Sequence, residues 1–162
     1  MRFFKSLSPI SILIGLLFFT SITTAQPARD RILDDVHIKE KDGCVTIHIG
    51  FTFPVRYVRH FPFEKGDELQ IQIEPIALGP LEQEAIFDRE STTPPHHRKA
   101  SLEDVIYEGD IEGGPFLRLL FTKEVGFEVG QGADFRSILV ALRKPAAGSD
   151  TPACPHLPDY KQ

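Results

Sequence analysis

The sequence contains the same pattern twice, and this repeat constrains the fold more than any other feature. Three motifs recur at almost the same spacing: Leu33-Asp34-Asp35-Val36 as Leu102-Glu103-Asp104-Val105, Phe51-Thr52 as Phe121-Thr122, and Leu69, Ile71 and Ile73 as Ile138, Val140 and Leu142. A small β unit with one apolar face must bury that face against a partner. The pattern therefore predicts a tandem duplication in which the copies 33–74 and 102–143 pack on each other.

Apolar and polar residues alternate in both copies, as is typical of strands with one buried face. The alternation includes Ile47 and Ile49 in the first copy and Leu117 and Leu119 in the second. Glycine-containing turns separate the expected strands, among them Lys41-Asp42-Gly43. The sequence predicts an all-β fold, a β-sandwich of two tandem-duplicated small sheets with four short strands per copy.

Segment 75–101, between the copies, is rich in proline and contains one stretch, Leu81–Phe87, that could form a short helix. We expect a long, partly ordered crossover. Because it is longer than most connections, it either has a function or covers exposed apolar surface. The duplicated domain then spans residues 26–145, and residues 146–162 form a Pro-rich C-terminal tail, a composition that disfavours helix and central strand.

Residues 1–25 have the pattern of a secretory signal peptide. Arg2 and Lys5 precede an apolar core, Ile10–Phe19, which is short for a membrane span, and small residues end at Ala25. The alternative is an uncleaved N-terminal anchor. With cleavage, we expect a periplasmic or secreted chain that does not span a membrane.

The chain has two cysteines, Cys44 and Cys154. Export to an oxidising compartment favours a disulfide between them, which would fasten the tail to the start of a strand. The alternative is a pair of free thiols with a catalytic or metal-binding role. Neither cysteine has the nearby second cysteine or spaced histidine pair that such a role would need.

The charge pattern argues against nucleic-acid binding. The formal net charge of −5 becomes more negative when the signal peptide is removed, and acidic and basic residues are interspersed. A nucleic-acid binder would be expected to present a basic stripe instead. His96-His97 suggests a metal site, but no His-Glu-x-x-His pattern supports it. We therefore expect no metal and no cofactor.

Catalytic patterns are also lacking. Ser101, Ser137 and Cys44 would each need an activating base, and no Gly-x-Ser-x-Gly motif is present. The acidic pairs Asp34-Asp35 and Glu103-Asp104 occupy equivalent repeat positions, so duplication explains them without an acid–base pair. The sequence predicts that the chain is not an enzyme.

The best candidate for ligand recognition is the segment containing Arg56, Arg59 and His60. Strand alternation predicts that Tyr57 points inward and that Arg56 and His60 point outward. The second copy has glycine in place of Arg56 and His60, so the two copies differ here. These side chains could hydrogen-bond a glycan, a carboxylate or an acidic protein group. The alternative is a solvated basic strand.

The outward positions of the second copy are partly apolar: Ile106, Leu120, Leu139 and Ala141. An apolar outer face implies a cover, which could be the crossover, the tail or a partner chain. We identify Ile106, Leu120 and Leu139 as the candidate interface.

The repeat resembles the AMIN domain, the N-terminal module of bacterial cell-wall amidases that also occurs in outer-membrane secretins. The resemblance covers Leu33 to Arg143. It depends on patterns such as Phe51-Thr52 with Val55-Arg56-Tyr57, and Leu117 to Phe121 followed by Val125-Gly126-Phe127 and Ile138-Leu139-Val140. It implies two small symmetric sheets and a targeting role through peptidoglycan or other envelope glycans. The long crossover and the tail with Cys154 depart from the family pattern.

The expected function is therefore a non-enzymatic periplasmic binding or targeting module of the bacterial cell envelope. Its partner would be cell-wall glycan or an envelope protein assembly. The alternative is a protein–protein interaction or structural subunit that uses the apolar outer sheet face.

Overall fold

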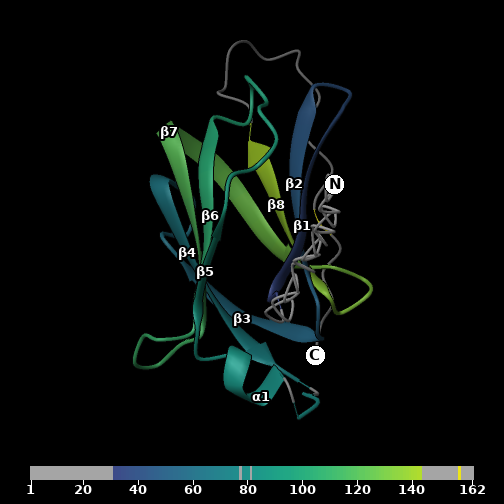
Figure 1. Cartoon of the computed structure of the whole chain (residues 1–162). Helices are drawn as coiled ribbons and strands as arrows, with labels where there is room; N and C mark the ends of the chain where they lie inside the picture. The colour runs from purple at the N-terminus through teal and green to yellow at the C-terminus, as the bar shows by residue number, and fades with distance from the viewer. Residues whose placement is uncertain (1–30, 77, 81, 144–156, 158–162) are drawn as a thin grey trace, which may run out of the picture.

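The computed structural model describes residues 31–76, 78–80, 82–143 and 157, and these are almost entirely β-strand (Figure 1). The elements are β1 (Leu33–Lys41), β2 (Cys44–Phe51), β3 (Val55–Phe61), β4 (Lys65–Pro75), α1 (Glu82–Ala85), β5 (Arg89–Thr92), β6 (Leu102–Glu108), β7 (Phe116–Gln131) and β8 (Ser137–Arg143). The expected all-β class is confirmed. In the part of the chain described, no helix has the length and apolarity to cross a membrane. The expected signal peptide and Cys154 lie outside the described residues.

The strands form one antiparallel sheet that is continuous through β7. The order is β1-β2-β8-β7-β4-β3, and β6 pairs with both β7 and β5. Within β7, residues 116–126 pair with β4 and residues 116–121 pair with β6, whereas residues 126–131 pair with β8. Figure 1 shows β7 crossing the molecule as its longest strand. The buried residues of both parts of the sheet belong to one hydrophobic core.

The sequence repeat is reproduced in the strand pairing. The same fully buried pairs face each other in both parts of the sheet: Ile47 with Val140 and Ile49 with Ile138 between β2 and β8, and Leu117 with Ile71 and Leu119 with Leu69 between β7 and β4. Each pair joins one residue from each copy. The two copies therefore do not form separate sheets. They exchange strands, so each apolar face is buried against the other copy.

The crossover is more regular than the sequence predicts. The short helix α1 lies inside the expected helical stretch. Strand β5, which the sequence analysis missed, pairs with β6, and Ser91 lies opposite Ile106. Residues 89–92 have little apolar alternation, so their strand conformation depends on the neighbouring edge of β6 rather than on a pattern of their own.

Two side chains complete the backbone hydrogen bonding at the strand edges. The Gln131 side chain accepts a hydrogen bond from the Tyr57 N–H at 2.7 Å and donates to the Val55 carbonyl oxygen at 3.2 Å. Glu90 of β5 accepts hydrogen bonds from the N–H groups of Ile32 at 2.7 Å and Leu33 at 3.3 Å. Buried edge groups are thereby paired without an additional strand.

Candidate functional site

The candidate recognition residues on β3 are held by cross-strand contacts to β4. Arg56 forms an ion pair with Glu74, and the Arg59 Nε donates a hydrogen bond to the Gln72 Oε1 at 2.8 Å. Both contacts follow from the antiparallel pairing of β3 with β4, which places Arg56 opposite Glu74 and Arg59 opposite Gln72. The two arginines are therefore pre-positioned on the sheet surface.

The predicted outward orientation of His60 is wrong because β3 contains a bulge. The register with β4 shifts between Tyr57 and Arg59, so His60 lies opposite the buried Ile71. The Tyr57 hydroxyl and the His60 Nδ1 are 2.6 Å apart, and the His60 ring packs edge-on against Phe127. One extra residue in a strand reverses the alternation beyond it. The same bulge places Arg59 and Phe61 opposite Gln72 and Gln70.

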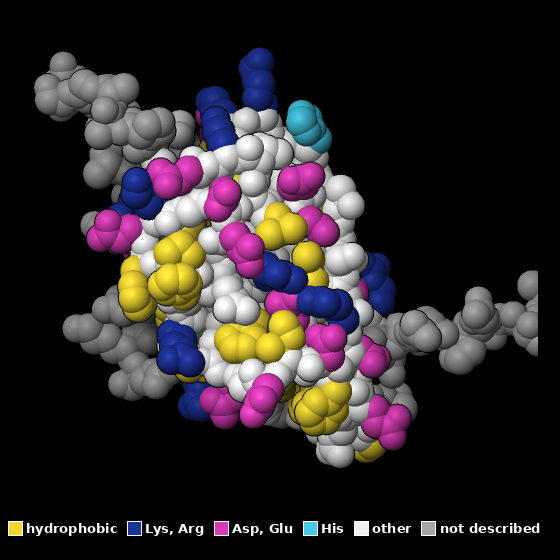
Figure 2. All heavy atoms as spheres, turned by 90° about the vertical axis from the view of Figure 1, so that its left-hand side faces the viewer, with side chains coloured by type: hydrophobic (Ala, Val, Ile, Leu, Met, Phe, Trp, Pro, Cys, Tyr) yellow, Lys and Arg dark blue, Asp and Glu magenta, His cyan; other side chains and the backbone are white. Residues whose placement is uncertain are grey.

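These residues line a shallow groove of about 230 Å³, which we call the phenylalanine groove. Its lining comprises Arg59, His60, Phe61, Phe63, Gln70, Gln72 and Phe116. Phe61 and Phe63 are 68% and 72% exposed, and their rings meet edge-to-face with centroids 6.2 Å apart. Figure 2 shows one face of the molecule, on which hydrophobic side chains gather in patches among acidic and basic ones. The predicted residue Arg56 does not line the groove.

Two exposed phenylalanines beside amide and guanidinium groups form a surface with a defined chemistry. The ring faces can pack against an apolar ligand surface, while Gln70, Gln72 and Arg59 provide hydrogen-bonding groups around it. Sequence analysis missed both glutamines, Phe63 and Phe116. The available signal was Phe61-Pro62-Phe63, where two large apolar residues lie at the end of a strand and in a turn instead of in the core alternation.

The candidate interface residues Ile106, Leu120 and Leu139 are half-buried. Part of the cover comes from the chain itself. Leu139 pairs with Gly130, and Leu157 lies against Gly130, where a Cβ would be 3.2 Å from the Leu157 Cβ. The Leu157 N–H also donates to Glu128 at 3.2 Å. A tail residue therefore contributes to the cover on this face, and the interface role of the three residues stays a prediction.

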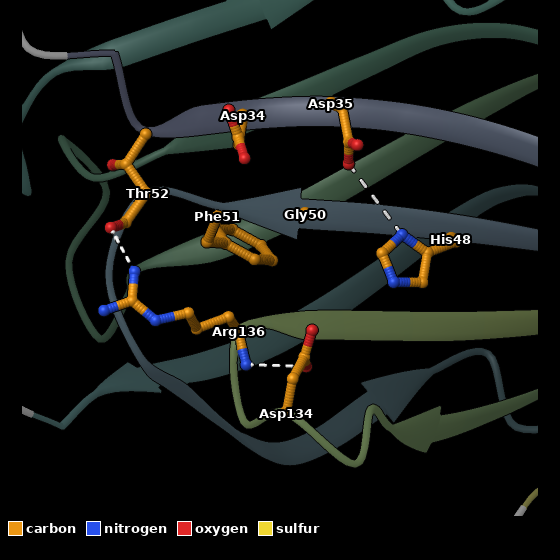
Figure 3. A pocket seen from close by; sticks show the side chains of 8 residues that line it. All are labelled: Asp34, Asp35, His48, Gly50, Phe51, Thr52, Asp134 and Arg136. Atoms are coloured by element: carbon orange, nitrogen blue, oxygen red, sulfur yellow. Dashed lines mark hydrogen bonds and ion pairs between the residues drawn. The ribbon is translucent and has the colours of Figure 1, made fainter.

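A second, larger hollow of about 410 Å³ lies on the outer side of β1 and β2, beside the turn that joins β7 to β8 (Figure 3). We call it the Gly50 hollow. It is lined by Asp34, Asp35, His48, Gly50, Phe51, Thr52, Asp134 and Arg136. Sequence analysis attributed Asp34 and Asp35 to the duplication and did not assign them to a site. The sequence alone did not reveal this hollow, because its other wall is the turn 132–136, which is far from residues 34–52 in the sequence.

Asp35 and Arg136 have defined partners in the Gly50 hollow. The Asp35 carboxylate is 2.7 Å from the His37 Nε2 and 3.8 Å from the His48 Nδ1. The Arg136 Nη1 donates to the Thr52 carbonyl oxygen at 2.7 Å.

Asp134 is held in the ionised form. Partial burial would raise the pKa of its carboxyl, but hydrogen bonds from the Arg136 N–H and the Ser137 hydroxyl lower it overall. The Gly50 hollow therefore keeps this negative charge at neutral pH. Within the described ranges, no group of three or more histidine, cysteine or acidic residues could hold a metal ion.

Comparison with protein-family models, curated proteins and solved structures finds no match. The resemblance to the AMIN domain therefore stays an interpretation of the sequence pattern. The phenylalanine groove and the Gly50 hollow share no lining residue.

Proposed function

We propose that the chain is a non-enzymatic binding module of the bacterial cell envelope that holds cell-wall glycan in the phenylalanine groove. The observation that supports this most directly is the exposure of Phe61 and Phe63 beside Arg59, Gln70 and Gln72. Exposed aromatic rings are costly to keep in water unless a ligand covers them. The sequence of residues 1–25 adds the expectation of export.

A sugar ring matches the two kinds of surface in the groove. Its C–H face can pack on the phenylalanine rings, and its hydroxyl groups can exchange hydrogen bonds with the Gln70 amide. The Gln72 amide is held by Arg59 and by the Gly113 carbonyl oxygen, to which it donates at 2.7 Å. Arg59 lies at the same edge and would favour a carboxylate attached to the sugar. The Arg59 Nε donates to Gln72, and its terminal nitrogens have no acceptor among the described residues, so they can donate to a ligand.

Sedimentation with insoluble peptidoglycan tests this proposal. The wild-type chain should be retained, and Phe61→Ala combined with Arg59→Ala should weaken retention at least about tenfold, or about 1.4 kcal/mol. Arg56→Ala is the matched control, because it removes an arginine from the same strand but outside the groove. Loss of retention in the control alone, or no retention of the wild-type chain, contradicts the proposal. If peptidoglycan does not retain the chain and the chain self-associates, the alternative function is favoured, a protein–protein interaction subunit that uses the apolar outer sheet face.

We also propose that the tail is attached through a Cys44–Cys154 disulfide. Cys44 begins β2 and is not a free cysteine, and Cys154 is the other cysteine of the sequence. The exported protein should therefore lack thiols that react with a thiol reagent under denaturing, non-reducing conditions. Treatment with a reductant should expose two thiols per chain. Two reactive thiols before reduction would contradict this prediction.

A further inference from the structure

The Gly50 hollow exists because the two copies differ at equivalent positions. Ile49 and Leu119 occupy matched register positions, so Gly50 is the counterpart of Leu120, and His48 is the counterpart of Arg118. In the second copy, the half-buried Leu120 supplies a side chain where Gly50 has none. In the first copy the Asp35 carboxylate lies beside this position instead, since a Cβ at Gly50 would be 2.4 Å from the Asp35 Oδ1.

In the second copy, the residue equivalent to His48 is charged and has an acidic partner. Arg118, the counterpart of His48, forms an ion pair with the fully buried Glu108. Among the described residues, the buried His48 Nδ1 has no hydrogen bond, and it lies 3.8 Å from the partly exposed Asp35 carboxylate. A buried polar atom without a partner is unfavourable unless a water molecule or a ligand group satisfies it.

Charged groups lie on both walls of the Gly50 hollow, acidic ones on each and Arg136 on one. Figure 3 shows Asp34 and Asp35 on β1 at one side and Arg136 and Asp134 on the turn at the other, with the bare backbone of Gly50 between them. The Asp34 carboxylate has no hydrogen bond or ion pair among the described residues, so both of its oxygens are available. The Arg136 Nη1 donates to the Thr52 carbonyl oxygen, and its Nη2 has no acceptor in the described part of the chain.

We propose that the Gly50 hollow binds a small zwitterion, a ligand that carries an ammonium and a carboxylate on neighbouring atoms, as a free amino acid does. The ammonium lies between Asp34 and Asp35, and the carboxylate accepts hydrogen bonds from Arg136. Because the lining has three aspartates and one arginine, it favours ligands with a further amine, such as lysine. The volume of about 410 Å³ falls within the range of small-molecule sites. This site is independent of the glycan proposal.

The test is a titration of the purified ¹⁵N-labelled chain with alanine and with lysine, followed through the Gly50 amide signal. We expect a saturable shift with both, and affinity at least about tenfold higher for lysine than for Nα-acetyl-lysine, which lacks the α-ammonium, or for lysinamide, which lacks the carboxylate. Gly50→Leu, which imitates the second copy, and Arg136→Gln should each weaken lysine binding at least about tenfold. The matched control Glu103→Gln alters the repeat counterpart of Asp34 and should bind as the wild type does.

The outcomes separate the possibilities. A Cβ at Gly50 would lie 2.4 Å from the Asp35 Oδ1, so Asp35 must turn aside in Gly50→Leu. If that variant fails to fold, lysine binding by Arg136→Gln still tests the proposal. An unshifted Gly50 amide in the wild-type chain, equal binding of lysine and Nα-acetyl-lysine, or unchanged binding by Arg136→Gln would overturn the proposal. Phe61→Ala should leave lysine binding intact, so the two sites can fail separately.

Discussion

Replacing Ile47 or its repeat counterpart Leu117 with alanine should lower the free energy of unfolding by similar amounts, about 2–5 kcal/mol each. Both side chains are fully buried in the same core. Ile47 faces Val140 and Leu117 faces Ile71, and each of these pairs joins the two copies. Truncation removes apolar area and leaves a cavity that the surrounding strands can fill only partly.

Urea denaturation of the two variants, followed by circular dichroism, measures this effect. Lys39→Ala, at an exposed position of β1, should change the free energy of unfolding by less than about 0.5 kcal/mol and serves as the control. A loss of several kcal/mol in one core variant with almost none in the other would show that the matched positions are not equivalent in the core. The structural repeat would then have no energetic counterpart.

The buried face of the sheet was predictable from the sequence because alternation and burial are directly connected. Ile47, Ile49, Leu117 and Leu119 occupy every second position, and all are fully buried. The turn Lys41-Asp42-Gly43 was predictable as well, since Asp42 and Gly43 both adopt positive φ values, 51° and 75°. Such a turn suits a tight hairpin and favours aspartate and glycine. Both features depend on residues close together in the sequence.

The candidate sites were less predictable because they depend on irregularities and on distant segments. The bulge after Tyr57 leaves no signature in the composition of β3, yet it turns His60 toward Phe127 and Phe61 outward. The phenylalanine groove needs Phe116 of β7 beside β3 and β4. The Gly50 hollow needs Arg136, which reaches β2 through the turn before β8. Neither partner follows from the local pattern.

Gln131→Leu should destabilise the fold by about 2–4 kcal/mol, although leucine matches the apolar surroundings of the site. Gln131 is 8% exposed and pairs with backbone groups of Tyr57, Val55 and Ser137. The Ser137 oxygen keeps a second partner in the Gly132 N–H at 2.8 Å. Leucine would leave the Tyr57 N–H without its acceptor, and burying such a group unpaired costs more than the added apolar contact returns.

Amide hydrogen exchange distinguishes this local effect from a general loss of packing. In Gln131→Leu, the Tyr57 amide should exchange faster by a larger factor than the global destabilisation explains, because its hydrogen-bond acceptor is removed. Gln131→Glu keeps an acceptor for that amide and should protect it better, while the donor to Val55 is lost. Gln83→Leu, at an exposed position of α1, should change neither stability nor exchange at Tyr57. If Gln131→Leu were as stable as the wild type, the start of β3 would be held by its pairing with β4 alone, and the Gln131 side chain would have no role in closing this edge.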